Sequence, residues 1–382
     1  MSYFPKKKLL VVDDSAFMRK LISDFFTNSS KIEVVGTARN GRDAIKKIQQ
    51  LQPDVITMDV EMPEMNGLEA LKEIMTVCPT PVVMLSSTTV EGAENTLTAM
   101  EYGAVDFVAK TSGTISLDLH KIQDELIHKV EQASLVSVAK LRKPLQRAVV
   151  QAPVEPKKPP LKSFMTKLPK PTATLEVPVP SKAIKRDWSK FSKKIILIGT
   201  STGGPRALQE VITKIPRNVD APILIVQHMP AGFTKSLANR LDQLSEIHVK
   251  EAEQGDILQN GTAYLAPGGY HLKLRKVGMS YGIILDQTEP PRSGHRPSVD
   301  VMFESASQIA DMDKVAVIMT GMGYDGSAGL KQLKASGNVM AIAESANTCI
   351  VYGMPKAAVE TQLVDEVVDV EHIAQTIMKF MS

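Results

Sequence analysis

A proline- and lysine-rich segment in the middle of the chain most constrains how this sequence can fold. Residues 144–180 contain nine of the 23 prolines in the 382 residues, many lysines and no periodic pattern of apolar side chains. Such a composition buries too little apolar surface to offset the entropy lost on ordering, so the segment is predicted to be a flexible linker. The sequence therefore predicts two folded domains, over residues 1–139 and 191–382, joined by a linker over residues 140–190.

The positive charge of the chain is concentrated in the same segment. Residues 140–194 hold 15 basic and 3 acidic side chains, whereas the parts before and after them carry net charges of −5 and −4. A DNA-binding regulator needs a basic recognition surface outside the linker, so this distribution predicts no nucleic-acid partner. The charge of the linker is expected to serve solubility, with attraction to acidic protein surfaces or lipids as the alternative.

The cysteine content and the N-terminus indicate a cytoplasmic protein. Two cysteines, Cys78 and Cys349, exclude a disulfide scaffold and suit a reducing compartment. The apolar run after the basic start extends only from Leu9 to Val12, which is too short for a signal peptide. No segment approaches the ~20 apolar residues of a membrane span, so direct membrane insertion is not expected.

Short β-branched apolar runs alternate with helical patterns through the first domain. This alternation predicts an α/β fold with a doubly wound parallel sheet of the flavodoxin-like kind. The predicted strands are 9–12, 32–36, 55–58, 82–85 and 106–109. The predicted helices are 15–27, 41–51, 66–76, 92–102 and 117–137.

The second domain shows the same alternation around a different central region. The predicted parallel strands are 195–198, 223–226, 315–319 and 339–343. One predicted helix begins at Pro205, and four others cover residues 233–243, 327–336, 353–360 and 370–380. Between the predicted helix 233–243 and the predicted strand 315–319 lie four short apolar runs, 247–251, 263–266, 271–275 and 282–285. We expect a second doubly wound, Rossmann-like parallel sheet with an antiparallel hairpin insert.

Polar residues follow several predicted strands of the first domain. Asp13 and Asp14 close the first strand, Asp59 the third, Ser86 the fourth and Lys110 the fifth. The carboxyl ends of parallel strands meet at one edge, where these carboxylates would favour magnesium. A carboxylate beside a metal ion and an ammonium suits the transfer of a phosphoryl group. The alternative, that strand-end aspartates cap the following helices, is less favoured for five such residues together.

The first domain resembles a known family through four motifs. Together these motifs, which lie within residues 8–110, resemble the receiver domain of bacterial two-component response regulators. They are VVDDSAFMRK, VITMDVEMPEMNGLEA, VVMLSS and GAVDFVAK. The resemblance implies that Asp59 is the phospho-acceptor. It also implies that Asp13, Asp14, Asp59 and the backbone carbonyl of Glu61 hold Mg²⁺.

The same resemblance implies roles for three further residues. Ser86 takes the place of the hydroxyl residue that follows the phosphoryl group, Lys110 that of the phosphate-sensing lysine, and Phe107 that of the aromatic switch. Receivers usually have a proline after this lysine, whereas this chain has Thr111. The geometry of that loop is therefore an open question, because a cis peptide bond is costly without proline.

The second domain opens with a candidate nucleophile. The strand 195–198 runs into GTSTGGP, which fits G-x-S-x-G with Ser201 on a turn before a helix that has Pro205 in its first turn. A hydroxyl at this position lies near helix N-terminal amides, which can stabilise an oxyanion. The alternative, a nucleotide-binding glycine loop, lacks both the G-x-x-x-x-GK[ST] lysine and the G-x-G-x-x-G spacing.

A serine nucleophile needs a base, and the base needs an orienting group. His228 ends the next predicted strand, and Asp325 follows the strand 315–319. A structural role for His228, a helix N-cap role for Asp325, and Asp300 as a rival third member remain alternatives. The other histidines fall on helix faces, in the insert or on loops, namely His120, His128, His248, His271, His295 and His372. The order Ser…His…Asp differs from that of the α/β-hydrolases.

Five further motifs carry a second resemblance. The motifs are IGTSTGGP, IVQHMPAGFT, YLAPGGYH, HRPSVDVMF and VIMTGMGYDGSAGL, all within residues 194–380. Together they resemble the chemotaxis protein-glutamate methylesterases (the CheB family). A receiver followed by such a domain matches the full architecture of that family. The resemblance implies Ser201 as nucleophile, His228 as general base and acid, Asp325 as its orienting residue, and the backbone amides of Thr202 and Met322 as oxyanion donors.

The resemblance also implies an activity and its partners. The enzyme would hydrolyse glutamate γ-methyl esters, and deamidate selected glutamines, on the cytoplasmic domains of chemoreceptors without a cofactor for ester hydrolysis. The unphosphorylated receiver would cover the catalytic cleft until a chemotaxis histidine kinase phosphorylates Asp59. A long polar linker fits this scheme because it lets the domains separate while keeping their effective concentration high.

Overall fold

The computed structural model describes residues 5–110, 118–141 and 192–381. Thr111 and the predicted linker over residues 140–190, except for its first two residues, lie outside this description. Over the three ranges that are described, no helix combines the length and the apolar character needed to cross a bilayer.

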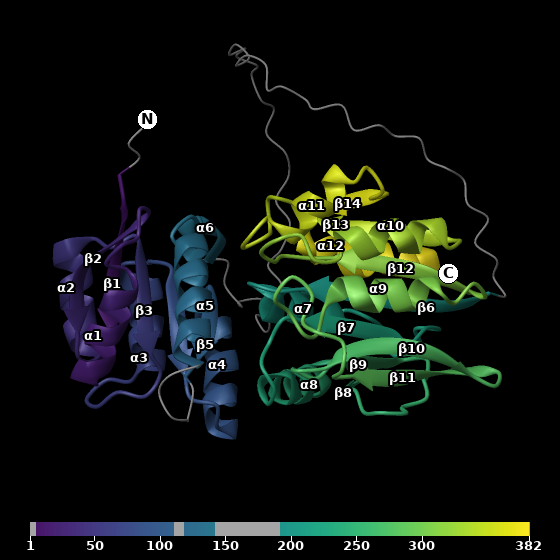
Figure 1. The fold of residues 1–382 in the computed structure, drawn as a ribbon, viewed down its shortest axis with the longest axis horizontal. Coiled ribbons are helices and arrows are strands. Elements are labelled where there is room, and N and C mark those ends of the chain that lie inside the picture. Colours follow the sequence, from purple (N-terminus) through teal and green to yellow (C-terminus); the bar gives the residue numbers. More distant parts are fainter. Residues whose placement is uncertain (1–4, 111–117, 142–191, 382) are drawn as a thin grey trace, which may run out of the picture. The chain divides into compact units, whose positions relative to one another are not determined.

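The first domain contains a five-stranded, all-parallel sheet with the strand order β2-β1-β3-β4-β5 (Figure 1). Its strands are β1 (Lys7–Val12), β2 (Ile32–Ala38), β3 (Val55–Asp59), β4 (Val82–Ser86) and β5 (Asp106–Ala109). The central strands β3 and β4 are buried along their whole length, as a parallel sheet covered on both faces requires. The predicted strands and the doubly wound fold are confirmed.

The helices of this domain begin at side chains that cap their free amides. Ser15, Asn40, Asn66 and Thr89 each accept a hydrogen bond from a backbone N–H in the first turn of the helix that follows. The helices are α1 (Ala16–Phe25), α2 (Gly41–Leu51), α3 (Gly67–Val77), α4 (Val90–Tyr102), α5 (Asp118–Ala133) and the short α6 (Val138–Leu141).

The second domain contains a seven-stranded parallel sheet with the order β14-β13-β12-β6-β7-β9-β8, shown in teal to yellow in Figure 1. Its strands are β6 (Lys193–Thr200), β7 (Ile223–Gln227), β8 (His248–Glu251), β9 (Thr262–Leu265), β12 (Met312–Ile318), β13 (Val339–Glu344) and β14 (Glu366–Val368). The strands β6 and β12 are adjacent although more than 100 residues separate them in the chain. The ends of β6, β7 and β12 are thereby brought together.

The predicted antiparallel hairpin insert is confirmed, but it contains only two of the four runs expected in it. The strands β10 (His271–Val277) and β11 (Ser280–Asp286) form an antiparallel hairpin, with His271 opposite Asp286. The other two predicted strands of the insert, β8 and β9, instead pair in parallel with each other, and β9 extends the main sheet next to β7. Short apolar runs do not reveal the direction of their partner, so the sequence pattern could not separate these two cases.

The helices of the second domain follow its strands. They are α7 (Gly204–Ile212), α8 (Phe233–Leu244), α9 (Val299–Ser307), α10 (Ser327–Ala335), α11 (Met354–Glu360) and α12 (Val370–Met381). Helix α9 and strand β14 were not predicted. Helix α9 begins within the HRPSVD motif, and its N-cap Ser298 accepts a hydrogen bond from the amide of Val301.

Candidate active site and phospho-acceptor site

Three carboxylates of the first domain meet at the carboxyl edge of its sheet. Asp13 directly follows β1, Asp59 ends β3, and the carboxylate oxygens of Asp13, Asp14 and Asp59 lie within 4.8 Å of one another. Asp13 and Asp59 are buried and Asp14 is exposed. Their side chains offer oxygen ligands only, which is the donor set that Mg²⁺ prefers. The backbone of Glu61, whose carbonyl is predicted to be a further ligand, hydrogen-bonds to the Asp59 carboxylate.

Lys110 joins this group from the end of β5. Its Nζ lies 2.8 Å from Oδ2 of Asp59 and 3.0 Å from Oδ2 of Asp13. Burial raises the pKa of Asp59 to about 6, with Asp13 adding to the effect and Lys110 opposing it. Burial opposes the charge of Lys110 as well, but the two carboxylates outweigh it and raise the pKa of the ammonium. A fixed cation therefore lies beside the predicted phospho-acceptor.

The hydroxyl of Ser86 points away from this group. Ser86 Oγ donates to the carbonyl oxygen of Gly92 in the first turn of α4, over 2.9 Å. Among the described residues, it makes no hydrogen bond to Asp59 or Lys110. The predicted role of Ser86 therefore requires its side chain to rotate when a phosphoryl group is present.

Lys129, for which no role was predicted, contacts the predicted switch residue Phe107. Lys129 Nζ, on α5, donates to the backbone oxygen of Phe107 over 2.6 Å and lies 5.1 Å from the centre of its ring. The same ammonium pairs with Asp106 and Glu125. Burial opposes the charge of Lys129, but these two carboxylates outweigh it and raise its pKa.

In the second domain, Ser201 lies on a tight turn between β6 and α7. Its amide donates to the carbonyl oxygen of Thr320 over 3.0 Å, and its own carbonyl accepts from Gly204 N over 2.7 Å. Gly203 has a φ of 77°, which suits a residue without Cβ. At Gly321, an added Cβ would lie 2.9 Å from Cβ of Ser201. The loop after β12 thus packs directly against the predicted nucleophile.

His228 directly follows β7, the strand that pairs with β6. Its amide donates to the carbonyl oxygen of Thr200 over 3.2 Å. The side-chain amide of Gln227 donates to the carbonyl oxygens of both Ser201 and His228, at 3.0 and 3.2 Å. Gln227 was not predicted, although a polar residue that ends the apolar run ILIVQ was a usable sign. These contacts hold the serine and histidine loops side by side.

The imidazole of His228 is hydrogen-bonded to Asp325. The distance from His228 Nε2 to Asp325 Oδ2 is 2.8 Å. Within the described part of the chain, the buried His228 Nδ1 has no hydrogen-bond partner. A carboxylate next to Nε2 favours the tautomer with the proton on Nε2, which leaves the Nδ1 lone pair free to accept a proton. No hydrogen bond joins Ser201 Oγ to His228 among the described residues.

Asp325 is held mainly by the start of α9, and it also accepts a hydrogen bond of 3.1 Å from the amide of Gly326, the N-cap of α10. It accepts hydrogen bonds from Ser298 Oγ and from the amides of Val299 and Asp300, at 2.9, 2.7 and 3.0 Å. Burial by itself favours the neutral carboxyl, but the bonds from His228 and these amides outweigh it and hold the pKa of Asp325 well below its usual range. Asp325 is therefore ionised at neutral pH.

Asp300, the rival third member, has a different position. Its Oδ1 accepts from the amides of Gly326 and Gly329 at the start of α10, at 2.9 and 2.6 Å. Burial and the nearby Asp325 raise the pKa of Asp300 to about 6. Among the described residues it makes no hydrogen bond to His228, so this geometry favours Asp325 as the partner of the histidine.

The amides predicted as oxyanion donors lie in the two loops that meet at Ser201. The carbonyl oxygen of Thr202 accepts from Thr320 Oγ1 over 2.9 Å, and Met322 follows the Gly321 that contacts Ser201. Neither the amide of Thr202 nor that of Met322 donates to any residue in the described ranges. Both are thus available to a bound oxygen atom.

A second imidazole, that of His295, lies against His228. The rings of His228 and His295 are stacked, with centroids 3.9 Å apart and planes inclined by 6°. The HRPSVDVMF motif contains His295 as its first residue, but nothing in the residue pattern indicated contact with a strand end 67 positions earlier.

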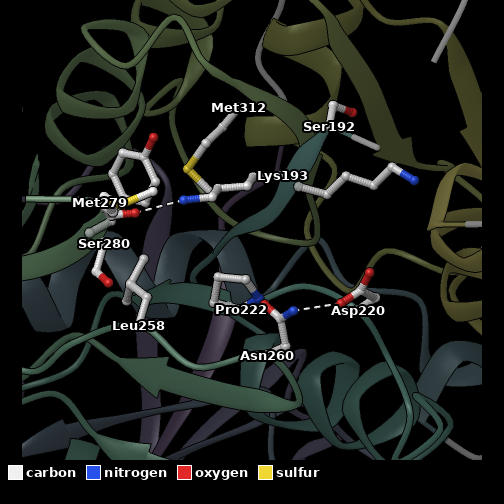
Figure 2. A pocket seen from close by; sticks show the side chains of 11 residues that line it. Ser192, Lys193, Asp220, Pro222, Leu258, Asn260, Met279, Ser280 and Met312 are labelled. Carbon is white, nitrogen blue, oxygen red and sulfur yellow. Dashed lines mark hydrogen bonds between the residues drawn. The ribbon is translucent and has the colours of Figure 1, made fainter. Parts of the chain in front are cut away.

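A cavity of ≈380 Å³ lies far from this chemistry, at the amino ends of the strands. Figure 2 shows Lys193 at the start of β6 and Met312 at the start of β12 on its wall. The ammonium of Lys193 donates to the carbonyl oxygen of Met279 over 2.6 Å, and Asn260 Nδ2 donates to Asp220 over 2.5 Å. Ser201 and His228 lie at the carboxyl ends of the same sheet, so this cavity is not their binding site.

The comparisons with known proteins cover both domains. Residues 196–377 match the family described as CheB methylesterase, and residues 9–120 match the response regulator receiver domain. A protein-glutamate methylesterase/protein-glutamine glutaminase of Halalkalibacterium halodurans is 55% identical over 97% of both chains. One from Geobacillus kaustophilus is 55% identical over 98% of both. The crystal structure of the Thermotoga maritima CheB methylesterase catalytic domain is 44% identical, covering 49% of this chain and 98% of that chain with a TM-score of 0.47.

Proposed function

Because the chain belongs to the family of protein-glutamate methylesterases/protein-glutamine glutaminases that carry a receiver domain before a CheB methylesterase domain, we propose that Ser201, His228 and Asp325 are its catalytic triad. The observation that carries the proposal is the 2.8 Å hydrogen bond between His228 Nε2 and Asp325 Oδ2. It leaves Nδ1 of a buried imidazole free at the strand end next to the serine turn. Residues placed in this way serve acyl transfer in unrelated folds.

The first half of the reaction forms a tetrahedral intermediate on the serine. Nδ1 of His228 takes the hydroxyl proton as Ser201 Oγ attacks the γ-carbonyl carbon of a methylated glutamate. The ionised Asp325 stabilises the resulting imidazolium. The unbonded amides of Thr202 and Met322 donate to the oxyanion, and the loss of one such donor costs about 3 kcal/mol of transition-state stabilisation.

The second half releases the products. The imidazolium gives its proton to the methoxy oxygen, and methanol leaves the acylated Ser201. His228 then takes a proton from water as the water attacks the acyl carbon, and it returns that proton to Ser201 Oγ as free glutamate leaves. Each ester therefore consumes one water molecule and yields one methanol. A glutamine side chain follows the same course with ammonia as the leaving group, which accounts for both activities named in the family.

The first domain is proposed to switch this activity on. Asp59 accepts the phosphoryl group from a chemotaxis histidine kinase, and Asp13, Asp14, Asp59 and the Glu61 carbonyl are the residues that would hold Mg²⁺. The ion offsets negative charge on the phosphoryl oxygens when bound. Lys110, which lies 2.8 Å from Asp59, contacts the phosphorylated side chain.

The substrates and regulation follow from this assignment. We propose that the enzyme acts in the cytoplasm on the cytoplasmic domains of chemoreceptors, which serves adaptation in chemotaxis. The unphosphorylated receiver restrains the catalytic domain, and residues 140–190 form the linker that lets the two separate after phosphorylation. No cofactor is needed for ester hydrolysis itself, because the nucleophile, base and oxyanion donors all belong to the chain.

The proposal is tested with the full-length enzyme and chemoreceptor membranes that carry radiolabelled methyl groups. The wild-type chain, supplied with acetyl phosphate and Mg²⁺, is expected to release labelled methanol, and Ser201→Ala is expected to release none above background. A release by Ser201→Ala at the wild-type rate would exclude Ser201 as the nucleophile. Mass spectrometry of the receptor peptides checks that glutamate is the product.

A further inference from the structure

The stacked ring of His295 is not explained by a triad alone. Its imidazole lies parallel to that of His228, with 3.9 Å between centroids and 6° between planes. His295 lies in the loop between β11 and α9, outside the strand ends that supply Ser201, His228 and Asp325. The contact covers one face of the predicted base, whereas Asp325 contacts its edge.

The edge contact leaves one motion of the base unrestrained. The hydrogen bond from His228 Nε2 to Asp325 fixes the position of one ring atom, but the ring can still tilt about the line through that atom and Cβ. A flat partner at van der Waals distance opposes this tilt because it would force ring atoms into contact. With the edge and one face both held, Nδ1 points in a single direction. A misplacement of about 1 Å is enough to lower a rate by two orders of magnitude.

His295 is itself rigidly placed by a tight turn. Ser293 and Gly294 have φ values of 51° and 83°, and Arg292 and His295 exchange two backbone hydrogen bonds of 3.0 and 2.9 Å. This is the geometry of a two-residue hairpin turn with positive φ at both central positions. The guanidinium of Arg292 pairs with Glu304 on α9. The turn is therefore anchored to the helix that also supplies amides to Asp325.

The charge state of His295 suits a partner that packs rather than reacts. Burial and the neighbouring His228 lower the pKa of His295 to about 3, so the ring is uncharged at neutral pH. Among the described residues, its ring nitrogens make no hydrogen bond. A neutral ring face tolerates the positive charge that forms on His228 during the reaction, because aromatic faces attract cations.

We propose that His295 is a positioning residue, whose stacked ring holds the His228 imidazole in the orientation from which Nδ1 takes the proton of Ser201. The inference rests on the proposed function, since it presupposes His228 as the base. It assigns no proton transfer to His295. What matters is the flat face of the side chain, so a ring without nitrogen atoms should serve nearly as well.

The test compares substitutions that keep or remove the flat face in the full-length chain. His295→Phe retains a planar ring, whereas His295→Leu removes it at a similar volume. His248→Leu is the matched control, because His248 pairs with Asp242 on the exposed edge of the domain. Two rates are measured in the presence of acetyl phosphate and Mg²⁺: methanol release from methylated receptor membranes, and covalent modification of Ser201 by a fluorophosphonate.

His295→Leu is expected to lower kcat and the rate of Ser201 modification by roughly 10- to 100-fold. The apparent KM should change by less than about twofold, because substrate contacts are not removed. His295→Phe should restore both rates to within a few-fold of wild type, and His248→Leu should not change them. Thermal unfolding is measured for each variant, and His295→Met replaces His295→Leu if the latter does not fold.

The outcomes separate the two proposals. Wild-type rates in a folded His295→Leu or His295→Met variant would overturn the positioning role, as would an equal loss in His295→Phe. Either result leaves the triad intact, provided that the fluorophosphonate still labels Ser201 in the wild type. If the wild type is not labelled, or if His228→Ala is labelled at the wild-type rate, the proposed function itself fails.

Discussion

Asp300 and Asp325 each cap the helix that begins beside the other. The carboxylate of Asp325 accepts hydrogen bonds from the amides of Val299 and Asp300 at the start of α9. The carboxylate of Asp300 in turn accepts hydrogen bonds from the amides of Gly326 and Gly329 at the start of α10. Helix N-termini favour negative charge. This reciprocal arrangement holds Asp325 in place for His228 and gives Asp300 a structural position.

Replacing Asp325 with asparagine should remove most of the activity. The amide can donate to His228 Nε2 and so stabilise the wrong tautomer, and the imidazolium loses its counter-charge. We expect kcat for methanol release to fall roughly 10³- to 10⁴-fold, the size of the same loss in other triads. Asp300→Asn is the matched control, since it keeps the acceptor for α10 and does not touch His228. A larger loss in Asp300→Asn than in Asp325→Asn would reverse the assignment.

Glu344 should make the stability of the chain depend on pH. This residue ends β13, is 1% exposed, and accepts from Thr320 N and Thr348 Oγ1 at 2.8 and 2.9 Å. Burial raises its pKa to about 7, from 4.5 in a solvated chain. The carboxyl is neutral in both states below about pH 4.5, and above pH 7 the folded state bears the full cost of a buried charge. Stability should therefore fall as the pH rises through this window.

The substitution Glu344→Gln tests this dependence. The glutamine keeps the volume and an acceptor for the amide of Thr320 but does not titrate. We expect the difference in unfolding temperature between the variant and the wild type to grow from pH 4.5 to pH 7.5 in favour of the variant, with a free-energy change on the order of 3 kcal/mol. A constant difference across this range would show that Glu344 does not titrate there.

An alanine at Gly321 should disturb the serine turn. Its Cβ would lie 2.4 Å from Met354 Sδ and 2.9 Å from Ser201 Cβ, so neighbouring groups must shift. Overpacking of this kind typically costs about 1–3 kcal/mol of stability, and we expect a clear loss of methanol release. At Gly255, where φ is 88° and an added Cβ meets nothing within 4 Å, alanine should cost roughly 1–2 kcal/mol through the backbone alone. That control should keep its activity, and a fully active Gly321→Ala would contradict the close packing.

Phosphorylation should depend on Asp59 and on magnesium. Acetyl phosphate with Mg²⁺ is expected to phosphorylate the wild-type chain, and neither Asp59→Asn nor EDTA-treated wild type should incorporate phosphate. Glu61→Gln should still be phosphorylated, because the resemblance assigns only its backbone carbonyl to the metal. Intact-protein mass spectrometry measures the added phosphate. Equal loss in Glu61→Gln and Asp59→Asn would place the Glu61 side chain in the site.

The parts of the molecule that follow from parallel-sheet topology were predictable. Apolar runs that end in a polar residue located Asp59 and His228 at strand ends, and such ends converge at one edge of a parallel sheet. The pairing of His228 with Asp325 lay within reach for the same reason. The choice between Asp325 and Asp300 could not be made from the sequence, because both residues lie at or just before the start of a helix. Only the fold shows which carboxylate faces the imidazole.

The parts that depend on loop geometry were not predictable. His295 reaches His228 through a turn with two residues at positive φ, and no periodic pattern reports where such a turn points. The parallel pairing of β8 with β9 was missed because a four-residue apolar strand looks the same in either direction. Lys129 was missed because a lysine on an amphipathic helix is ordinarily solvated.

The pairing of β6 with β12 also bears on the point during synthesis at which the enzyme can become active. Ser201 and His228 leave the ribosome well before the strand β12 and the loop that carries Thr320 and Asp325. Until β12 inserts beside β6, the serine turn lacks the carbonyl that accepts its amide, and the histidine lacks its carboxylate. This contact spans more than 100 residues, and contacts of such long range slow folding. If Ser201, His228 and Asp325 form the proposed triad, the nascent chain gains no esterase activity before Asp325 has emerged.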